Sequence, residues 1–170
     1  DGIRDRSPSR GLGDVYKRQA KDFDPEADRG NGEENPRLVP LAYDGKPDTA
    51  WTTVTYLSNA KMGGLKPGVG VVFDLGKAVP VSAVELLLVG SGTTVDLRVP
   101  AKDAPTVTAP PMGAVDQWTV VASSTGAGTS VRLAPQQAVT TRFVLVYLSQ
   151  LPSLGNNRYQ GGIAEITVRP

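Results

Sequence analysis

The sequence predicts an all-β domain, a sandwich or barrel of about eight strands. Nineteen glycines and 14 prolines separate short runs of β-branched residues, a composition typical of a fold with many turns. No stretch of useful length has the 3.6-residue period of an amphipathic helix. A chain of 170 residues fits one domain that buries a substantial core.

Alternating or continuous apolar runs mark the expected strands. Two of them, 69–75 and 79–89, flank a predicted turn at 74–76. The other expected strands lie at 94–99, 117–122, 130–133, 142–148 and 162–168, with one more directly before Asp44. The segment 104–111 is expected to be a loop, because proline has no N–H to donate to a strand ladder. The aperiodic segment 52–67 is expected to be a long surface loop.

The chain divides into a tail (1–19), an acidic leader (20–37) and a body (38–170). The tail is polar, rich in arginine and aperiodic, which predicts disorder. Its segment 14–19, DVYKRQ, resembles translated sequencing-adapter DNA, which would make the tail an artefact. The tail holds five basic and three acidic residues, so the remainder has a net charge of −1. The remaining basic residues are scattered, so no nucleic-acid partner is expected.

The acidic leader has two readings. Its acidic residues do not have the spacing of a helix–loop–helix calcium loop. They are Asp22, Asp24, Glu26, Asp28, Glu33 and Glu34. The segment is therefore either a solvated linker or a second, irregular cation site, and Phe23 and Pro25 suggest that part of it docks on the body.

The chain contains no Cys and no His. Disulfides, zinc–thiolate sites, thiol nucleophiles and every mechanism that needs imidazole are therefore excluded. Asp103 and Asp116 could form the carboxylate pair of a glycosidase, but nothing places them together. We expect no catalytic residues and no enzymatic activity. No apolar run is long enough to span a membrane, and no signal peptide is visible.

Oxygen ligands concentrate in the segment 38–51. An apolar run stops at Asp44 and Gly45, a pair that favours a tight turn, and Asp48 and Thr49 follow. Carboxylates, a hydroxyl and inward carbonyls are the ligands that calcium prefers, and Glu165 near the C-terminus would add another. In the alternative reading, Asp44 only caps the turn and Glu165 pairs with a base.

Aromatic residues in loops are the candidates for ligand binding. Tyr56 and Tyr159 lie in such segments, and polar side chains accompany them: Asn59, Asn156, Asn157, Arg158 and Gln160. An aromatic face with amide and guanidinium donors suits a sugar, although ordinary polar loops have the same composition. Trp51, Trp118 and Tyr147 are expected in the core instead.

Three motifs carry a resemblance to a known family. They are DGKPDTAW at 44–51, VVFDLGKAVPVSAVELL at 71–87 and IAEITV at 163–168. They resemble the discoidin or coagulation factor type C family, which consists of galactose-binding-like domains. The resemblance implies a jelly-roll β-sandwich that binds a ligand without catalysis. Matched to the family's metal loop, it implies calcium held by the side chains of Asp44, Thr49 and Glu165 and by the carbonyls of Leu41, Lys46, Thr49 and Ala164.

A closer resemblance covers the leader as well. The segments 22–36 (DFDPEADRGNGEENP), 63–76 (GGLKPGVGVVFDLG) and 158–168 (RYQGGIAEITV) resemble the extracytoplasmic C-terminal domain of actinobacterial MurJ/MviN-type lipid II flippases. The implied function is a monomeric domain in the cell envelope, part of a membrane-embedded parent protein, that contacts cell-wall glycan or an envelope protein. The alternative is a carbohydrate-binding module of a secreted glycoside hydrolase.

Overall fold

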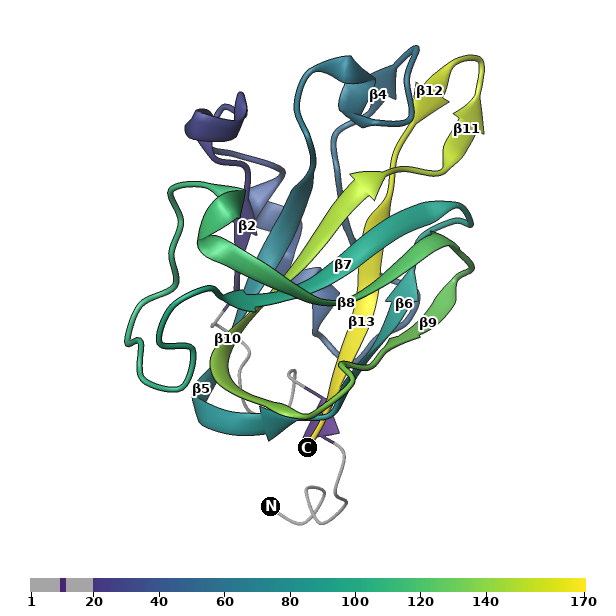
Figure 1. Cartoon of the computed structure of the whole chain (residues 1–170). Helices are drawn as coiled ribbons and strands as arrows, with labels where there is room; N and C mark the ends of the chain where they lie inside the picture. Colours follow the sequence, from purple (N-terminus) through teal and green to yellow (C-terminus); the bar gives the residue numbers. More distant parts are fainter. Residues whose placement is uncertain (1–9, 12–19) are drawn as a thin grey trace.

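The computed structural model describes residues 10–11 and 20–170, which form two antiparallel sheets packed face to face (Figure 1). Sheet A has the order β1-β13-β6-β9, and β3 also pairs with β13. Its strands are β1 (Arg10–Gly11), β3 (Trp51–Thr52), β6 (Ala83–Leu88), β9 (Ser130–Leu133) and β13 (Gly162–Arg169). Sheet B has the order β2-β5-β10-β7-β8. Its strands are β2 (Ala20–Phe23), β5 (Val69–Val81), β7 (Thr93–Pro100), β8 (Trp118–Ala127) and β10 (Val139–Gln150).

A third, small sheet and four short 3-10 helices complete the described elements. Sheet C has the order β11-β12-β4 and stands at one end of the sandwich, at the top of Figure 1. Its strands are β4 (Tyr56–Leu57), β11 (Ser153–Gly155) and β12 (Arg158–Tyr159), and the helices are η2 (Glu26–Asp28), η3 (Pro36–Ala42), η4 (Met62–Gly64) and η5 (Val115–Gln117). No helix in the described part of the chain is long and apolar enough to cross a membrane. The expected all-β jelly-roll sandwich is confirmed.

Two local expectations are wrong. The apolar run before Asp44 is the 3-10 helix η3 rather than a strand, because Pro36 and Pro40 fix their own φ angles and lack the N–H that a ladder needs. The turn predicted at 74–76 is a bend inside the 13-residue strand β5. β10 pairs with β5 on both sides of this bend, and a register shift between Thr141 and Phe143 absorbs the extra residues.

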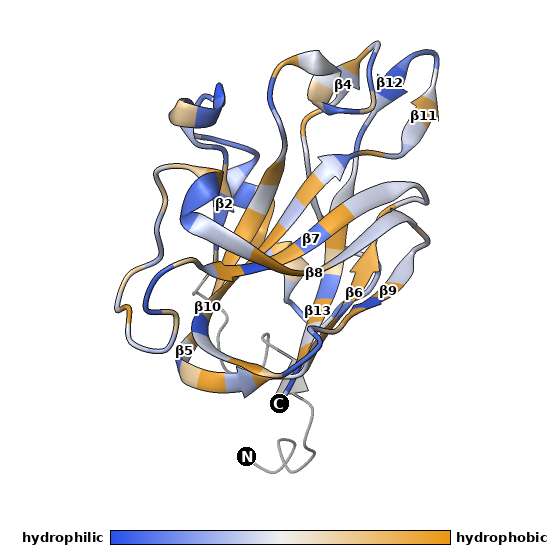
Figure 2. Cartoon of the chain, viewed as in Figure 1, coloured by the Kyte–Doolittle hydropathy of each residue, from blue (hydrophilic) through white to orange (hydrophobic). Residues whose placement is uncertain are grey.

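Buried apolar residues form two clusters. The larger lies between sheets A and B and includes Trp51, Phe73 and Ile166, which explains the orange interior in Figure 2. The smaller lies on the outer face of sheet B and contains Phe23, Trp118, Phe143 and Tyr147 among its members. Side chains of the segment 101–117, Val107, Met112 and Val115, cover it. The segment 101–117, the proline-rich loop, therefore covers a second apolar core.

The acidic leader is not a solvated linker. Its first residues form β2, an edge strand of sheet B, so part of the segment 20–37 belongs to the sandwich. Phe23 is fully buried, and the carboxylates of Asp22, Asp24 and Glu34 are also buried. Of the predicted tail, Arg10–Gly11 form β1 and pair with Val168 and Thr167, whereas the rest of the tail lies outside the described residues.

Candidate functional site

The Asp44 loop lies against the last strand, as the calcium hypothesis requires. The loop leaves η3, which packs against β13, the strand that carries Ala164 and Glu165. The Gly45 N–H donates to Oε2 of Glu165 at 2.6 Å, and the Lys46 N–H donates to Oδ1 of Asp44 at 2.9 Å. Gly45 has φ +80°, a conformation that glycine adopts without strain. Two segments 120 residues apart thus meet at this loop.

The Asp44 and Glu165 carboxyl groups lie close together. Burial raises the pKa of Glu165 to about 7, the Gly45 N–H opposes that rise, and the neighbouring Asp44 adds to it. Partial burial also acts to raise the pKa of Asp44, but hydrogen bonds, above all from the Thr49 hydroxyl, lower it overall. Among the described residues, no ion pair involves either carboxylate. The expected base for Glu165 is therefore not found there, whereas Asp44 does cap its turn.

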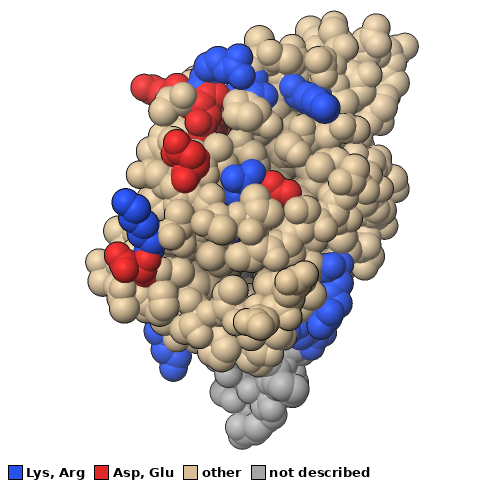
Figure 3. Space-filling view, in the orientation of Figure 1, with Lys and Arg blue, Asp and Glu red and all other residues tan. Residues whose placement is uncertain are grey.

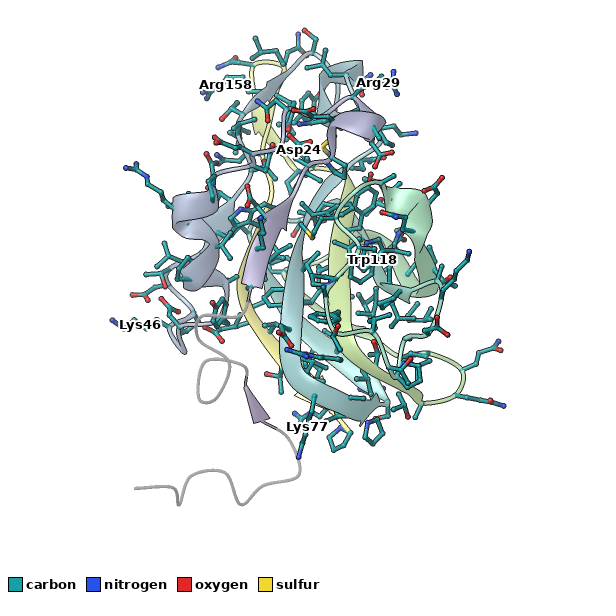
Figure 4. All side chains as sticks on the ribbon, turned by 90° about the vertical axis from the view of Figure 1, so that its left-hand side faces the viewer. Asp24, Arg29, Lys46, Lys77, Trp118 and Arg158 are labelled. Carbon is teal, nitrogen blue, oxygen red and sulfur yellow. The ribbon has the colours of Figure 1, made fainter. Side chains whose placement is uncertain are left out.

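This arrangement fits a hard cation. Two carboxylates and a hydroxyl converge without a positive side chain to balance them, which is the chemistry of a calcium site. The Lys46 carbonyl faces the Thr49 hydroxyl at 3.2 Å, and the Lys46 side chain points to solvent (Figure 4). The described part of the chain contains no group of three acidic side chains that could hold a metal, so carbonyl oxygens would have to complete the shell.

A second acidic cluster, the leader cluster, already contains its cation. It consists of Asp22, Asp24, Glu34, Tyr56 and Lys66. The Lys66 ammonium lies 2.9 Å from Oδ1 of Asp24 and 3.4 Å from Oε1 of Glu34. Oδ2 of Asp22 accepts the Glu34 N–H at 2.6 Å. Lys66 supplies the positive charge beside these carboxylates. An internal ion pair therefore replaces the second, irregular cation site that the sequence suggested for the leader.

Tyr56 is not at the surface, contrary to expectation. Its side chain is 5% exposed, and its hydroxyl donates to Oε2 of Glu34 at 2.8 Å. The Lys66 ammonium lies 5.4 Å from the centre of its ring. Burial raises the pKa of this hydroxyl, and the adjacent Glu34 charge raises it further. The ring therefore offers no face to a sugar and instead joins sheet C to the leader cluster.

The other predicted ligand-binding residues gather at the sheet C end. β12 pairs with β4, so that Tyr159 stands opposite Tyr56 and Arg158 opposite Leu57. Tyr159 is half-buried against the main core, whereas Arg158 is exposed. Asn156 is exposed in the tight β11–β12 turn with φ +56°. Figure 4 places Arg158 at the same end of the molecule as Arg29, and Lys77 at the opposite end.

A hollow of about 540 Å³ lies where η4 approaches the upper ends of β7, β8 and β10. Most of its lining residues carry a hydroxyl, amide or ammonium group, together with the apolar parts of the same side chains. The lining residues are Asn59, Lys61, Gly64, Lys66, Pro67, Thr94, Thr125, Ser149 and Gln150. Asn59 is the one predicted ligand-binding residue among them. The strand-end residues were missed because single hydroxyl and amide side chains in a strand carry no sequence signal of their own.

Several solved structures of carbohydrate-binding modules are similar in fold to this chain. No model of a known protein family matches the chain. Chitosan-binding module 1 of a chitosanase/glucanase from Paenibacillus sp. IK-5 is 19% identical with a TM-score of 0.61, over 95% of this chain and 99% of that one. Module 2 of the same enzyme, in complex with chitotriose, is 19% identical with a TM-score of 0.59, over 92% and 98%. The family 32 module of Clostridium perfringens NanJ, in complex with galactose, is 17% identical with a TM-score of 0.51, over 89% and 92%.

The fold is a jelly-roll β-sandwich similar to that of these modules. This likeness spans nearly the whole described chain and nearly the whole of each of the three modules. It confirms the discoidin-like fold that the motifs at 44–51, 71–87 and 163–168 predicted. At these identities it establishes the architecture alone.

Proposed function

We propose that this chain is a non-catalytic carbohydrate-binding domain whose binding surface is the end formed by sheet C and the polar hollow. The support is the fold, since the similar modules are named for binding chitosan or were solved with chitotriose or galactose. The chain contains no Cys and no His, so thiol nucleophiles and imidazole proton transfer are not available to it.

The hollow is the observation that carries the proposal. Sugar hydroxyls need paired donors and acceptors, and the hollow offers the amides of Asn59 and Gln150 and the hydroxyls of Ser149 and Thr125. These groups come from the loop between β4 and η4, from β8 and from β10, which together line one hollow. Arg158 and Asn156 of the β11–β12 hairpin lie exposed at the same end of the molecule and would contact a longer glycan.

A glycan array followed by calorimetry of the strongest ligand tests this proposal. We expect Asn59→Ala and Gln150→Ala to weaken binding about tenfold each, the equivalent of roughly 1.4 kcal/mol, because each removes hydrogen bonds to the sugar. Lys77→Ala, at the far end of the molecule, is the control and should leave binding unchanged. Equal affinity of all four proteins would place the site elsewhere, and the absence of any glycan ligand would refute the function.

We also propose a structural calcium ion at the Asp44 loop. Asp44, Thr49 and Glu165 would bind through side-chain oxygens, and Leu41, Lys46, Thr49 and Ala164 through carbonyls. The support is the convergence of two carboxylates without a counter-charge. Bound calcium would neutralise both carboxylates and fasten the loop to β13. Calorimetric titration with calcium chloride tests this, and Glu165→Gln should abolish the binding heat.

For the biological setting, we propose a domain of the cell envelope, attached to a lipid II flippase of the MurJ/MviN type and directed at cell-wall glycan or an envelope protein. The support is the order and spacing of the segments 22–36, 63–76 and 158–168. A module of a secreted glycoside hydrolase is the second candidate, favoured by the two chitosan-binding modules that derive from a chitosanase/glucanase. The parent gene decides: many apolar segments of about 20 residues indicate the flippase, and a catalytic domain indicates the hydrolase.

A further inference from the structure

We propose that β8 is a self-association edge, where the β8 strands of two copies of this chain pair antiparallel and join their B sheets. Neither the sequence motifs nor the similar modules suggest this contact. It depends on the position, the length and the composition of one strand.

β8 stands at the free edge of sheet B. In the described part of the chain it pairs with β7 and with no other strand. A free edge presents unpaired N–H and C=O groups that can accept another strand. β8 has ten residues, whereas β2, at the opposite edge of the same sheet, has four. β8 therefore offers the longer ladder for a partner.

The charged and proline residues that protect many free edges are missing from β8. Natural edge strands carry lysine, proline or inward charges that discourage pairing. The segment 117–131, which contains all of β8, has no charged residue and no proline, whereas β2 carries Lys21 and β9 carries Arg132. Two irregularities remain in the pairing with β7: a register shift opposite Leu97 and Arg98, near Val121, and a second opposite Thr93 and Val95, near Gly126. The rest of β8 is regularly paired with β7.

The exposed surface of β8 favours a neutral partner. Val120 is 42% exposed, and Thr119, Ser123 and Thr125 are exposed beside it. In the space-filling view, much of the face that contains β8 is uncharged, apart from one basic and acidic pair near its centre and a basic patch at its lower right (Figure 3). β-Branched and hydroxyl side chains pair well across strands.

The occupant that best fits this edge is the same strand from a second copy. An antiparallel pair related by a two-fold axis places neutral residues opposite neutral residues, so no like charges meet. A strongly charged segment of another protein would gain no ion pair from β8. The free strand is also already extended, so little ordering entropy opposes the pairing.

Sedimentation equilibrium of the full chain over a wide concentration range tests the proposal. We expect a reversible monomer–dimer equilibrium and, in hydrogen exchange, protection of β8 amides that increases with concentration. Val120→Lys should shift the dissociation constant at least tenfold towards monomer, because it places on the pairing edge the charge that natural edge strands use to discourage pairing.

Val54→Lys is the matched control. Val54 is 41% exposed, nearly the same as Val120, but lies outside sheets A and B. Val54→Lys introduces the same charge and should leave the monomer–dimer equilibrium unchanged. Melting curves of both lysine variants check that each is folded. A monomer at every concentration would overturn the proposal. A dimer that both lysine variants weaken equally would also overturn it, as would a dimer whose formation leaves the hydrogen exchange of the β8 amides unchanged.

Discussion

The leader cluster and the Asp44 loop each bring carboxylates close together, but different groups face these carboxylates. In the leader cluster the Lys66 ammonium contacts two buried carboxylates, Asp24 and Glu34, and the Tyr56 hydroxyl and backbone N–H groups are further donors. The Asp44 loop brings two carboxylates together with only hydroxyl and backbone donors. One cluster therefore contains an internal cation, whereas no ion pair among the described residues involves the two carboxylates of the Asp44 loop. The difference shows that two groups of carboxylates in one chain can depend on different partners.

Removing the internal cation should have the largest effect. Lys66→Met leaves Asp24 and Glu34 buried without their counter-charge, which we expect to cost about 3–5 kcal/mol of unfolding free energy. Urea denaturation measures it. Lys61→Met, a nearby exposed lysine, is the control and should stay within roughly 0.5 kcal/mol of wild type. Similar stability of the two variants would mean that the leader cluster does not depend on its lysine.

Adding an external cation should have the next largest effect, and only at the other cluster. Free calcium at a hundredfold excess over its dissociation constant should add about 2.7 kcal/mol to stability by mass action. Thermal melting in calcium and in chelator measures this increment. Asp44→Ala and Glu165→Gln should remove it, whereas Lys66→Met, if folded, should retain it. Superimposable wild-type curves in the two buffers would show that hydrogen bonds alone close the loop.

The pH dependence should differ between the two clusters as well. In chelator, Glu165 has a pKa of about 7 against an ordinary 4.5, so the folded state holds its proton more tightly. That stability is fully present below pH 4.5 and is lost as the pH rises through 7. Calcium requires the ionised carboxylate and should reverse this trend. Burial also raises the pKa of Glu34. In Glu165→Gln, stability should therefore still fall as the pH rises, and it should do so equally with and without calcium.

The smallest expected effect concerns Lys46. Its backbone belongs to the Asp44 loop while its side chain is exposed, so Lys46→Ala should leave the calcium-induced shift unchanged and alter stability by less than about 0.5 kcal/mol. Melting curves with and without calcium suffice. A clear loss of the shift would show that the ammonium group, rather than the carbonyl, matters to the loop.

The fold was predictable because its evidence is local. Apolar alternation identified the long strands, and the order of short motifs identified the jelly roll. The strand expected before Asp44 was wrong because two prolines outweighed an apolar pattern. The absence of a 3.6-residue period excludes long amphipathic α-helices, but it does not exclude a short 3-10 helix such as η3.

The site was predictable only where neighbours in sequence are neighbours in space. Asp44 and Thr49 are five residues apart, and their contact follows from the turn. The leader cluster could not be predicted, because Lys66 is 42 residues from Asp24 and no pattern links them. For the same reason Tyr56 was expected to be exposed: its partner Glu34 lies in a segment that sequence alone presented as a solvated linker.

The two tryptophans divide between the two apolar clusters, which gives the domain a pair of built-in fluorescent reporters. Trp51 is fully buried in the main core, and Trp118 is buried beneath the proline-rich loop on the outer face of sheet B. Since the chain has only these two, Trp51→Phe and Trp118→Phe each leave emission from a single cluster. Coincident unfolding transitions would show that the outer cluster melts with the sandwich, and an earlier transition of Trp118 would show that the proline-rich loop opens first.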